Sequence, residues 1–249
     1  MKRTKKLELR KLNLKNPIDF YYWPTPNGWK VSIALEEMQL PYETKLVNIN
    51  KGDQFKKDFL KISPNNRIPA ITDYEGPKGE KISLFESGAI LHYLALKTSS
   101  YLGNNDADYH ETVKWLMWQM GGLGPMAGQA HHFLRYAPNM TPSQDIPYAK
   151  NRYKYEVKRL YQVLETNLGG RDFVAGNFFS IADMAIWPWI SLWRRQDQNI
   201  DLFPNIKSWS DRCKNRTAVQ KGRDLLKQKR SNIEEDKNAQ KILFNQPKV

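Results

Sequence analysis

The chain has 249 residues, of which 40% are hydrophobic, and it carries a net charge of +13. This composition excludes a wholly disordered chain, and no apolar run approaches the roughly 18 residues that a membrane-spanning helix needs. The single cysteine, Cys213, excludes an internal disulfide and a cysteine-based metal site, so a reducing cytoplasm is the expected location.

The first part of the chain predicts strands and helices in alternation. Residues 18–22 indicate a strand, and the spacing of apolar residues from position 28 to 39 indicates a helix. The further elements predicted here are strand 42–49, helix 54–61, strand 68–72, a hairpin turn at 76–79, strand 81–85 and a helix from Glu86-Ser87 through Leu96. This order predicts a thioredoxin-like α/β domain with a small mixed sheet.

Two details of this domain indicate a ligand site. The turn after the first strand places Thr25 and Asn27 at a helix N-terminus, where free N–H groups and the helix dipole favour an anion or a thiolate. No cysteine lies near this turn, so a thiol that reacts here must arrive with a ligand. Pro69 cannot donate a strand hydrogen bond, and we expect a cis bond before it that exposes the Ile68 backbone to a ligand.

The second part of the chain predicts helices almost throughout. The predicted helices cover residues 113–120, 148–168, 181–193, 206–213 and 218–226. Glycines at 121, 122 and 124, with Pro125, are expected to break the first of these helices and to widen the site. Residues 232–249 are polar and predict an arm or a disordered tail.

These patterns predict an α/β thioredoxin-like N-terminal domain followed by an all-α C-terminal domain. The expected boundaries are a basic N-terminal arm at 1–16, the thioredoxin-like domain at 17–97, a linker at 98–108, the helical domain at 109–228 and a polar tail at 229–249.

Five motifs in this order resemble the glutathione transferases over residues 17–228, at positions 24–28, 63–71, 85–88, 121–126 and 180–189. They look most like the bacterial nu class, which is similar to the yeast nitrogen-regulation prion protein. The resemblance implies a homodimer that binds glutathione and favours glutathione-dependent disulfide reduction over aromatic conjugation.

Thr25 and Asn27 are the candidate catalytic residues. A hydroxyl and an amide at a helix N-terminus can stabilise the glutathione thiolate and lower its pKa. The alternatives are that Thr25 is only a helix cap and that Asn27 is only a turn residue. Tyr21 and Tyr22 are possible hydroxyl donors, but the alternation of the strand places at least one in the core.

The other site residues follow the parts of glutathione. The Ile68 backbone, before Pro69, would pair with the cysteinyl part as an added strand. Glu86 and Ser87 would hold the γ-glutamyl end, although a plain helix cap is the alternative. Gln54, Asn66 and Arg67 are expected at the glycyl end, and Arg152 matches an arginine that the nu class uses for ligand binding; either arginine is alternatively a surface charge.

The helical domain offers further candidates but no metal site. His131 and His132 are adjacent, so they point in different directions on a helix, and no further ligand lies nearby. Tyr136 is a polar candidate near the cleft. Residues 180–183 have the form of a capping box that starts a buried helix. Cys213 and the tryptophans at 187, 189, 193 and 209 are expected in the core.

The expected reaction is thiol–disulfide exchange between glutathione and a small disulfide. Conjugation of glutathione to an electrophile, or a peroxidase step, would use the same residues, and a non-catalytic regulatory or binding protein is a further alternative.

Of the net charge, residues 1–16 carry +6 and residues 221–249 carry +4, so only +3 remains for residues 17–220. Because basic ends are commonly solvated tails, nucleic acid is not an expected partner.

Overall fold

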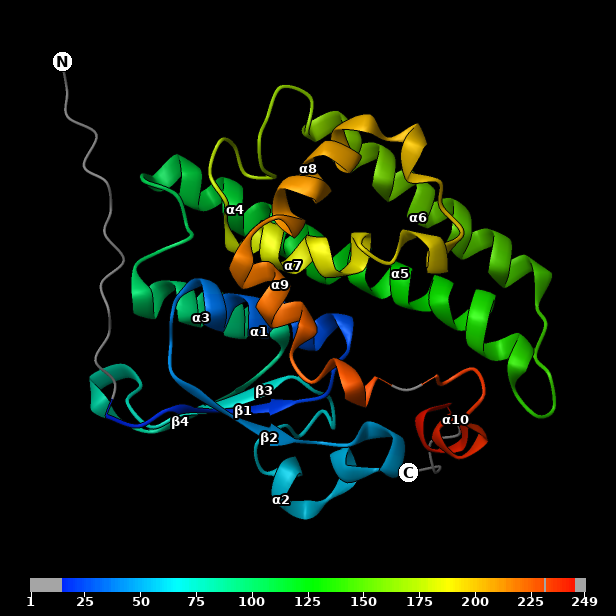
Figure 1. Cartoon of the computed structure of the whole chain (residues 1–249), viewed down its shortest axis with the longest axis horizontal. Helices are drawn as coiled ribbons and strands as arrows, with labels where there is room; N and C mark the ends of the chain where they lie inside the picture. Colours follow the sequence, from blue (N-terminus) through cyan, green and yellow to red (C-terminus); the bar gives the residue numbers. More distant parts are fainter. Residues whose placement is uncertain (1–14, 231, 245–249) are drawn as a thin grey trace.

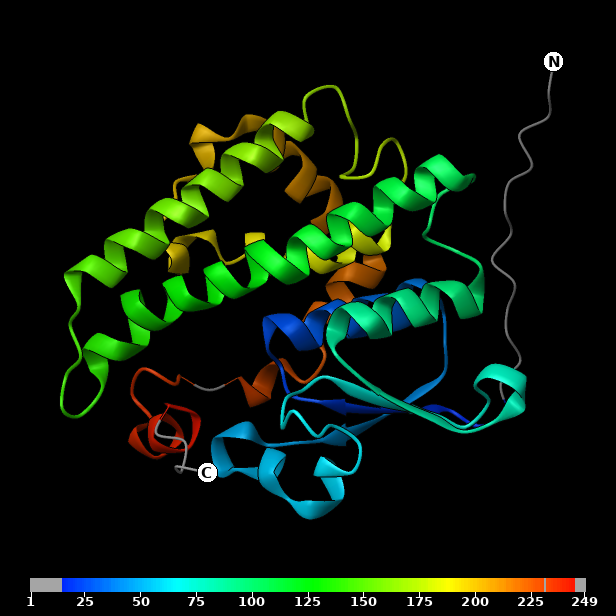
Figure 2. The ribbon, with the colours of Figure 1, turned by 180° about the vertical axis from the view of Figure 1, so that it is seen from behind.

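The structure is a computed structural model that describes residues 15–230 and 232–244. A four-stranded sheet lies in one layer, with helices α1 (Pro26–Glu37) and α3 (Ser87–Thr98) on one face and α2 (Lys57–Leu60) on the other (Figure 1). The remaining large helices stack on α1 and α3, away from the sheet, and the view from behind shows the same order of layers (Figure 2). Most of the predicted basic arm, residues 1–14, lies outside the described residues.

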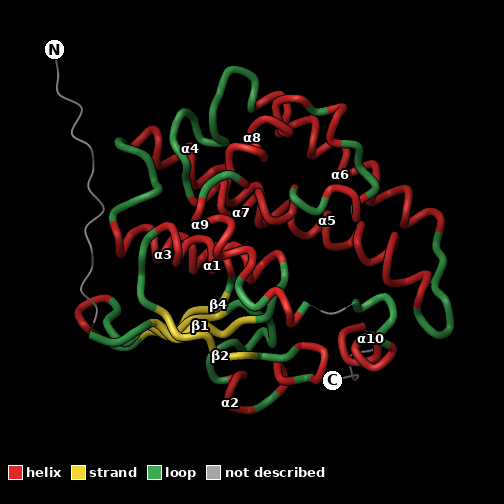
Figure 3. Tube along the Cα trace, in the orientation of Figure 1, coloured by secondary structure: helices red, strands yellow, loops and turns green. Residues whose placement is uncertain are grey.

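The sheet has the mixed topology predicted for a thioredoxin-like domain. Its strands are β1 (Ile18–Tyr22), β2 (Tyr42–Leu46), β3 (Ala70–Asp73) and β4 (Ile82–Phe85), in the order β2-β1-β3-β4. Figure 3 shows the strands in yellow, below the helices α1 and α3. β1 runs parallel to β2, with Phe20 opposite Thr44, and antiparallel to β3, with Phe20 opposite Ile71. A parallel pair needs a crossover connection, which α1 supplies.

The segment between β2 and β3 is less regular than predicted. The strand ends at Leu46 rather than at 49, because the Asn48 side chain accepts from the Asn50 N–H and Gly52 adopts a left-handed φ of 81°. The expected helix over 54–61 is divided into a 3₁₀ turn, η2 (Asp53–Phe55), and α2, since Lys56 is extended. The cis bond predicted between Ile68 and Pro69 is present, and β3 begins directly after it.

The expected helix break at residues 121–125 is wrong. Helix α4 (Asp106–Trp118) continues through a π-helical turn, η4 (Gln119–Leu123), into α5 (Gly124–His131) and a second π turn, η5 (His132–Tyr136). Gly124 and its neighbours keep right-handed helical angles. Pro125 lies in the first turn of α5, where its missing N–H is tolerated, so the segment bends without ending.

The rest of the helical domain follows the predicted pattern, with one exception at its end. Helix α7 (Ile181–Ile190) is buried at every position, as its apolar sequence predicts. The predicted polar tail instead contains a helix, α10. The other elements are 3₁₀ turns η1 (Ile49–Lys51), η3 (Pro77–Gly79), η6 (Ala137–Asn139), η7 (Trp193–Gln196), η8 (Ile200–Leu202) and η9 (Lys227–Lys229), and helices α6 (Pro147–Asn167), α8 (Pro204–Lys214), α9 (Thr217–Asp224) and α10 (Lys237–Phe244). None of the described helices is long and apolar enough to cross a bilayer.

Helix α1 joins the two parts of the molecule. It packs against α3, α7 and α9, and one hydrophobic core extends from the sheet into the helical layer. The approach of α9 is so close that a Cβ at Gly222 would lie 2.5 Å from the Ile33 nitrogen, and the Ser32 hydroxyl donates to the Gly222 carbonyl at 2.7 Å. At the other end of α1, Glu37 accepts two hydrogen bonds from Arg216, at 2.6 and 2.7 Å.

Asp183 begins the buried helix α7 and also ties it to its neighbours. The predicted capping box with Ser180 is present. The same carboxylate accepts from the Val174 N–H at 2.9 Å and from the Trp209 indole at 2.8 Å. Asp183 is completely buried, so it satisfies donors that have no access to water.

We expect Asp183→Ala to lower the free energy of unfolding by about 3 kcal/mol, because several buried donors lose their acceptor together. Urea unfolding followed by circular dichroism measures the change. Asp211→Ala, on the exposed face of α8, is the control and should leave stability nearly unchanged. A loss below about 1 kcal/mol in Asp183→Ala would show that this carboxylate is a simple helix cap.

Candidate functional site

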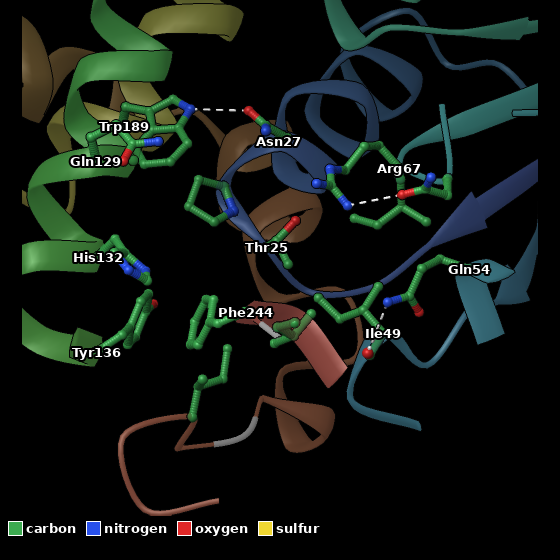
Figure 4. Close-up of a pocket in the computed structure, with 16 residues that line it drawn as sticks. Thr25, Asn27, Ile49, Gln54, Arg67, Gln129, His132, Tyr136, Trp189 and Phe244 are labelled. Atoms are coloured by element: carbon green, nitrogen blue, oxygen red, sulfur yellow. Dashed lines mark hydrogen bonds between the residues drawn. The ribbon is translucent and has the colours of Figure 1, made fainter. Parts of the chain in front are cut away.

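A cavity of about 530 Å³ opens between the β1–α1 turn and the helical domain (Figure 4). A second cavity of about 440 Å³ adjoins it and shares with it Asn27, Arg67 and Trp189. Six of the predicted site residues line the first cavity: Thr25, Asn27, Gln54, Asn66, Arg67 and Ile68. Glu86 lines the second. The fold therefore brings together residues that are separated by up to 61 positions in the sequence.

Thr25 is the N-cap of α1, so it lies at the helix N-terminus where the sequence placed it. Its side-chain oxygen accepts from the Gly28 N–H at 3.3 Å, so its hydroxyl proton remains available as a donor toward the cavity. The turn is tight, and a Cβ at Gly28 would lie 2.5 Å from the Trp23 carbonyl oxygen. The capping role and an anion-binding role are compatible, because both use the first turn of the same helix.

Asn27 is oriented by a residue from the other domain. The Trp189 indole N–H donates to Asn27 Oδ1 at 3.0 Å (Figure 4). An indole nitrogen can only donate, so the amide oxygen must face Trp189 and the amide NH₂ group remains as a donor. The sequence indicated Trp189 only as a core residue. It is 92% buried in the core, and it also sets the direction of the Asn27 amide.

The two tyrosines of β1 are not positioned to activate a thiol. Tyr22 is fully buried and its hydroxyl donates to the Leu225 carbonyl at 3.1 Å. Burial raises the pKa of Tyr22 well above its ordinary value. Tyr21 packs its ring against Phe59 instead. The burial of Tyr22 agrees with the expectation that the strand alternation places at least one of the two tyrosines in the core.

The wall of the cavity opposite the helical domain carries unsatisfied or exposed polar groups. Gln54 is buried and donates to the Ile49 carbonyl at 3.2 Å, whereas its Oε1 has no partner among the described residues. A buried acceptor without a protein partner is costly unless water or a ligand donates to it. Beside it, Arg67 donates to Asn66 Oδ1 at 3.0 Å, and Ile68 reaches the cavity just before the cis peptide bond.

The second cavity has a buried cation at its base, which the sequence analysis missed. Lys30 is 99% buried and donates to Gln119 Oε1 at 2.7 Å and to Ser87 Oγ at 3.4 Å. Burial lowers the pKa of Lys30 to about 7, while the negative charge of Glu86 opposes this shift. The available signal was a single lysine between Trp29 and Val31 on an otherwise buried helix.

Glu86 holds a strained backbone conformation at this cavity. Its φ of 68° and ψ of 112° are unusual for a residue with a side chain. Strain of this kind persists where the surrounding structure holds a functional geometry. The Glu86 carboxylate accepts from Asn65 at 3.2 Å and otherwise faces the second cavity.

Three predicted residues do not line either cavity. Pro69 and Ser87 adjoin the lining residues Ile68 and Glu86, and Ser87 is buried. Arg152 lies on α6, where its guanidinium is 3.8 Å from Glu156. Sequence reasoning missed several lining residues: Gln129 and His132 of the helical domain, and Ile233, Leu243 and Phe244 near the C-terminus. Tyr136, a candidate from the sequence, does line the first cavity.

Within residues 15–230 and 232–244, no group of three histidine, cysteine or acidic side chains is arranged to hold a metal. His131 packs on Trp189 with a ring separation of 5.5 Å, and burial lowers its pKa to about 3. His132 faces the cavity, and burial lowers its pKa as well, which favours an uncharged ring.

Comparison with known proteins identifies two matching family models. Residues 25–97 match the glutathione S-transferase N-terminal domain, and residues 132–217 match the glutathione S-transferase C-terminal domain. The disulfide-bond oxidoreductase YfcG of Escherichia coli K12 is 48% identical over 211 residues, which cover 84% of this chain and 95% of YfcG.

Two solved structures support the same assignment. A glutathione transferase from Burkholderia graminis, with two glutathione molecules bound per subunit, has a TM-score of 0.80 and 41% identity, and covers 87% of this chain and 91% of its own. One from Pseudomonas putida, with one glutathione disulfide bound per subunit, has a TM-score of 0.79 and 40% identity, and covers 87% of this chain and 94% of its own. The chain belongs to the glutathione S-transferase family, in the nu-class-like group that contains YfcG.

Proposed function

We propose that this protein is a glutathione-dependent disulfide-bond oxidoreductase that acts on small disulfides. The observation that carries the proposal is the pair of donors at the start of α1. The Thr25 hydroxyl and the Asn27 amide line the same cavity, and both retain hydrogens for an anion. The name of YfcG, a disulfide-bond oxidoreductase, supports this activity, as does the glutathione disulfide in the Pseudomonas putida structure.

Glutathione would lie along the two cavities with its sulfur at Thr25 and Asn27. Gln54 Oε1 would accept a hydrogen bond from the ligand, and the Ile68 backbone would pair with its peptide part. Asn66 and Arg67 would hold the glycyl carboxylate. In the second cavity, Glu86 would accept from the γ-glutamyl amino group and Lys30 would hold the γ-glutamyl carboxylate. Ser87, which adjoins this lining and accepts from Lys30, would hold the same carboxylate.

The reaction would proceed as thiol–disulfide exchange. The bound glutathione loses its thiol proton to solvent, and the thiolate attacks one sulfur of a disulfide R–S–S–R. A sulfur–sulfur bond forms between glutathione and R–S, and the other R–S leaves as a thiolate that takes a proton from solvent. A second glutathione thiolate attacks the glutathione sulfur of this mixed disulfide. Glutathione disulfide forms, and the remaining R–S leaves.

The protein's contribution to this reaction is electrostatic. A thiolate is the reactive form of a thiol, and donors at a helix N-terminus lower the pKa of the group that they contact. Cys213 is unsuited to this role, because it is completely buried and burial raises its pKa. The reactive sulfur would therefore belong to glutathione, and no metal is needed for the exchange.

We also propose a homodimer in a reducing cytoplasm. Large apolar side chains exposed on three helices, Leu96 of α3, Met117 of α4 and Tyr155 of α6, support an interface on this chain. Sedimentation equilibrium measures the mass of the assembly, and a monomer at micromolar concentration would contradict the proposal.

Arg152, on α6, stays a predicted glutathione ligand. Its guanidinium must move away from Glu156 to contact glutathione.

The double variant Thr25→Ala/Asn27→Ala should lower kcat/KM for glutathione-dependent reduction of hydroxyethyl disulfide by about 100-fold, because two donors to the thiolate are lost. Turnover is followed through glutathione reductase and NADPH. Asn105→Ala is the matched control, since Asn105 caps α4 in the same way but does not line either cavity. Unchanged turnover in the double variant would exclude this sulfur site. Inactivity of the unaltered protein, with conjugation of an electrophile in its place, would favour the transferase alternative.

Binding of S-methylglutathione should weaken by about threefold to tenfold as the pH rises from 6 to 8. Burial lowers the pKa of Lys30 to about 7, so its ammonium is mostly charged at pH 6 and mostly uncharged at pH 8. The ligand has no thiol to titrate, and burial lowers the pKa of His132, which favours its uncharged form. Isothermal titration calorimetry measures the affinity. Lys30→Met should remove the pH dependence, whereas the exposed-site control Lys114→Met should retain it. The same pH dependence in Lys30→Met would show that Lys30 does not contact the ligand.

A further inference from the structure

The hydrogen bond between Trp189 and Asn27 is a contact between the two domains at the proposed sulfur site. Trp189 lies near the end of α7 in the helical domain, and Asn27 lies in the first turn of α1. The two residues are 162 positions apart in the sequence, and Figure 4 shows the indole nitrogen directed at the amide oxygen. The thioredoxin-like domain therefore supplies the candidate donor to the sulfur, and the helical domain determines how that donor is turned.

Buried hydrogen bonds fix Trp189 in this position. The Gln196 side-chain nitrogen donates to the Trp189 carbonyl at 2.7 Å. The Gln196 side-chain oxygen accepts in turn from the Tyr161 hydroxyl of α6 at 2.8 Å. Tyr161 and Gln196 are both completely buried. Three hydrogen bonds, linked through Gln196 and Trp189, therefore connect α6 with the Asn27 amide.

Helix α5 packs against the indole ring. The ring of His131 lies 5.5 Å from the ring of Trp189, and a Cβ at Gly128 would lie 3.4 Å from the Trp189 ring. Burial lowers the pKa of His131 to about 3, so its ring is uncharged near neutral pH. Trp189 itself is buried. In a close-packed core these contacts resist rotation of the indole, so the direction of its N–H is set by the helical domain.

We propose that Trp189 is a positioning residue for the glutathione thiolate, because it keeps the NH₂ group of Asn27 directed at the sulfur. The proposal rests on the proposed function. An amide side chain has a donor end and an acceptor end, and an unconstrained amide can turn either end toward a ligand. The oxygen would repel a thiolate, whereas the NH₂ group donates to it. By occupying the oxygen, the indole selects the orientation that stabilises the thiolate, so the acidity of the bound thiol depends on the helical domain.

The strength of hydrogen bonds to charged groups gives the expected size of the effect. A hydrogen bond from a neutral donor to an anion changes the pKa of that group by about 1 to 2. Loss of the indole leaves the Asn27 amide in place but free to turn, so part of this stabilisation is lost. We therefore expect the thiol pKa of bound glutathione to rise by about 1 in Trp189→Phe.

The thiol pKa is measured at saturating glutathione from the ultraviolet absorption of the thiolate as the pH changes, as a difference from the complex with S-methylglutathione. Asn27→Ala should raise this pKa at least as much as Trp189→Phe does. The double variant Trp189→Phe/Asn27→Ala should show no further rise, because the indole acts only through Asn27.

Trp187→Phe is the matched control. Trp187 lies on the same helix, is also buried, and its indole donates to the Ser210 carbonyl at the same distance of 3.0 Å. It lines neither of the two cavities. The control therefore loses an equivalent indole hydrogen bond and should keep the thiol pKa of the unaltered protein.

Other titratable side chains share the two cavities with Trp189. They are present in every variant and in the S-methylglutathione complex: Lys30, Arg67, Glu86, His132 and Tyr136. Burial lowers the pKa of Lys30 to about 7 and also lowers that of His132. Because the reference complex contains the same groups, their own titration is subtracted and the remaining step belongs to the thiol.

A measurement on the unaltered protein tests the same contact without a substitution. The indole N–H resonance of Trp189 in nuclear magnetic resonance spectra should shift with the midpoint of the thiolate absorption, since linked hydrogen bonds polarise one another. This step should be missing from the complex with S-methylglutathione, which has no thiol. The Trp187 resonance should show no such step in either complex.

The outcomes separate this proposal from the proposed function. If bound glutathione keeps the thiol pKa of free glutathione in the unaltered protein, the proposed sulfur site is wrong, and the role of Trp189 with it. A lowered thiol pKa that stays the same in folded Trp189→Phe, or single effects that add in the double variant, would overturn the role of Trp189 and leave the sulfur site intact. Thermal unfolding by circular dichroism shows whether each variant is folded. If Trp189→Phe does not fold, a Trp189 resonance without the thiol-dependent step overturns the role of Trp189 by itself.

Discussion

The burial of helix α1 between the sheet and the helical layer determines where the cavity lies. Nine of its twelve residues are buried, and it contacts α3, α7 and α9. The Ser32–Gly222 hydrogen bond and the Glu37–Arg216 ion pair hold it along its length. Its first turn is therefore fixed at the boundary between the domains. A hydrogen-bond donor in this turn therefore faces both the thioredoxin-like domain and the helical domain. A donor enclosed within one domain would face that domain alone.

Two hydrogen-bond donors control the polarity of the cavities. Trp189 occupies the oxygen of the Asn27 amide, and Lys30 occupies the oxygen of the Gln119 amide. Each amide is left with its NH₂ group, and Gln119 Nε2 has no partner among the described residues. Together with the N-terminus of α1 and Arg67, these groups make a surface rich in donors. Such a surface suits a ligand with two carboxylates and a thiolate, even though the chain's excess positive charge lies near its ends.

Local signals predicted the parts of the site that depend on backbone geometry. The strand-to-helix turn, the proline that precedes β3 and the capping box before α7 each have a short sequence signature, and the structure contains all three. Contacts between distant residues carry no such signature. From the sequence, Trp189 and Lys30 are equally compatible with a core that contacts no ligand. Only the folded structure shows that they contact the amides of Asn27 and Gln119. The glycines at 121, 122 and 124 led to the wrong prediction of a helix break, because a π turn is as compatible with glycine and proline as a break is.

Helix α10 shows why the C-terminus was the least predictable part of the cavity. Four of its eight residues are apolar, but the helix is short and the residues before it are polar, so its sequence has no helical stripe long enough to predict independent stability. Its order comes from docking on two surfaces, η1 and the loop at Asn139, that exist only after both domains have folded. The side chains that it brings to the cavity are apolar, and they add no hydrogen-bond donor to the site. A helix docked in this way shapes the apolar part of the cavity and leaves the donors at the start of α1 unchanged.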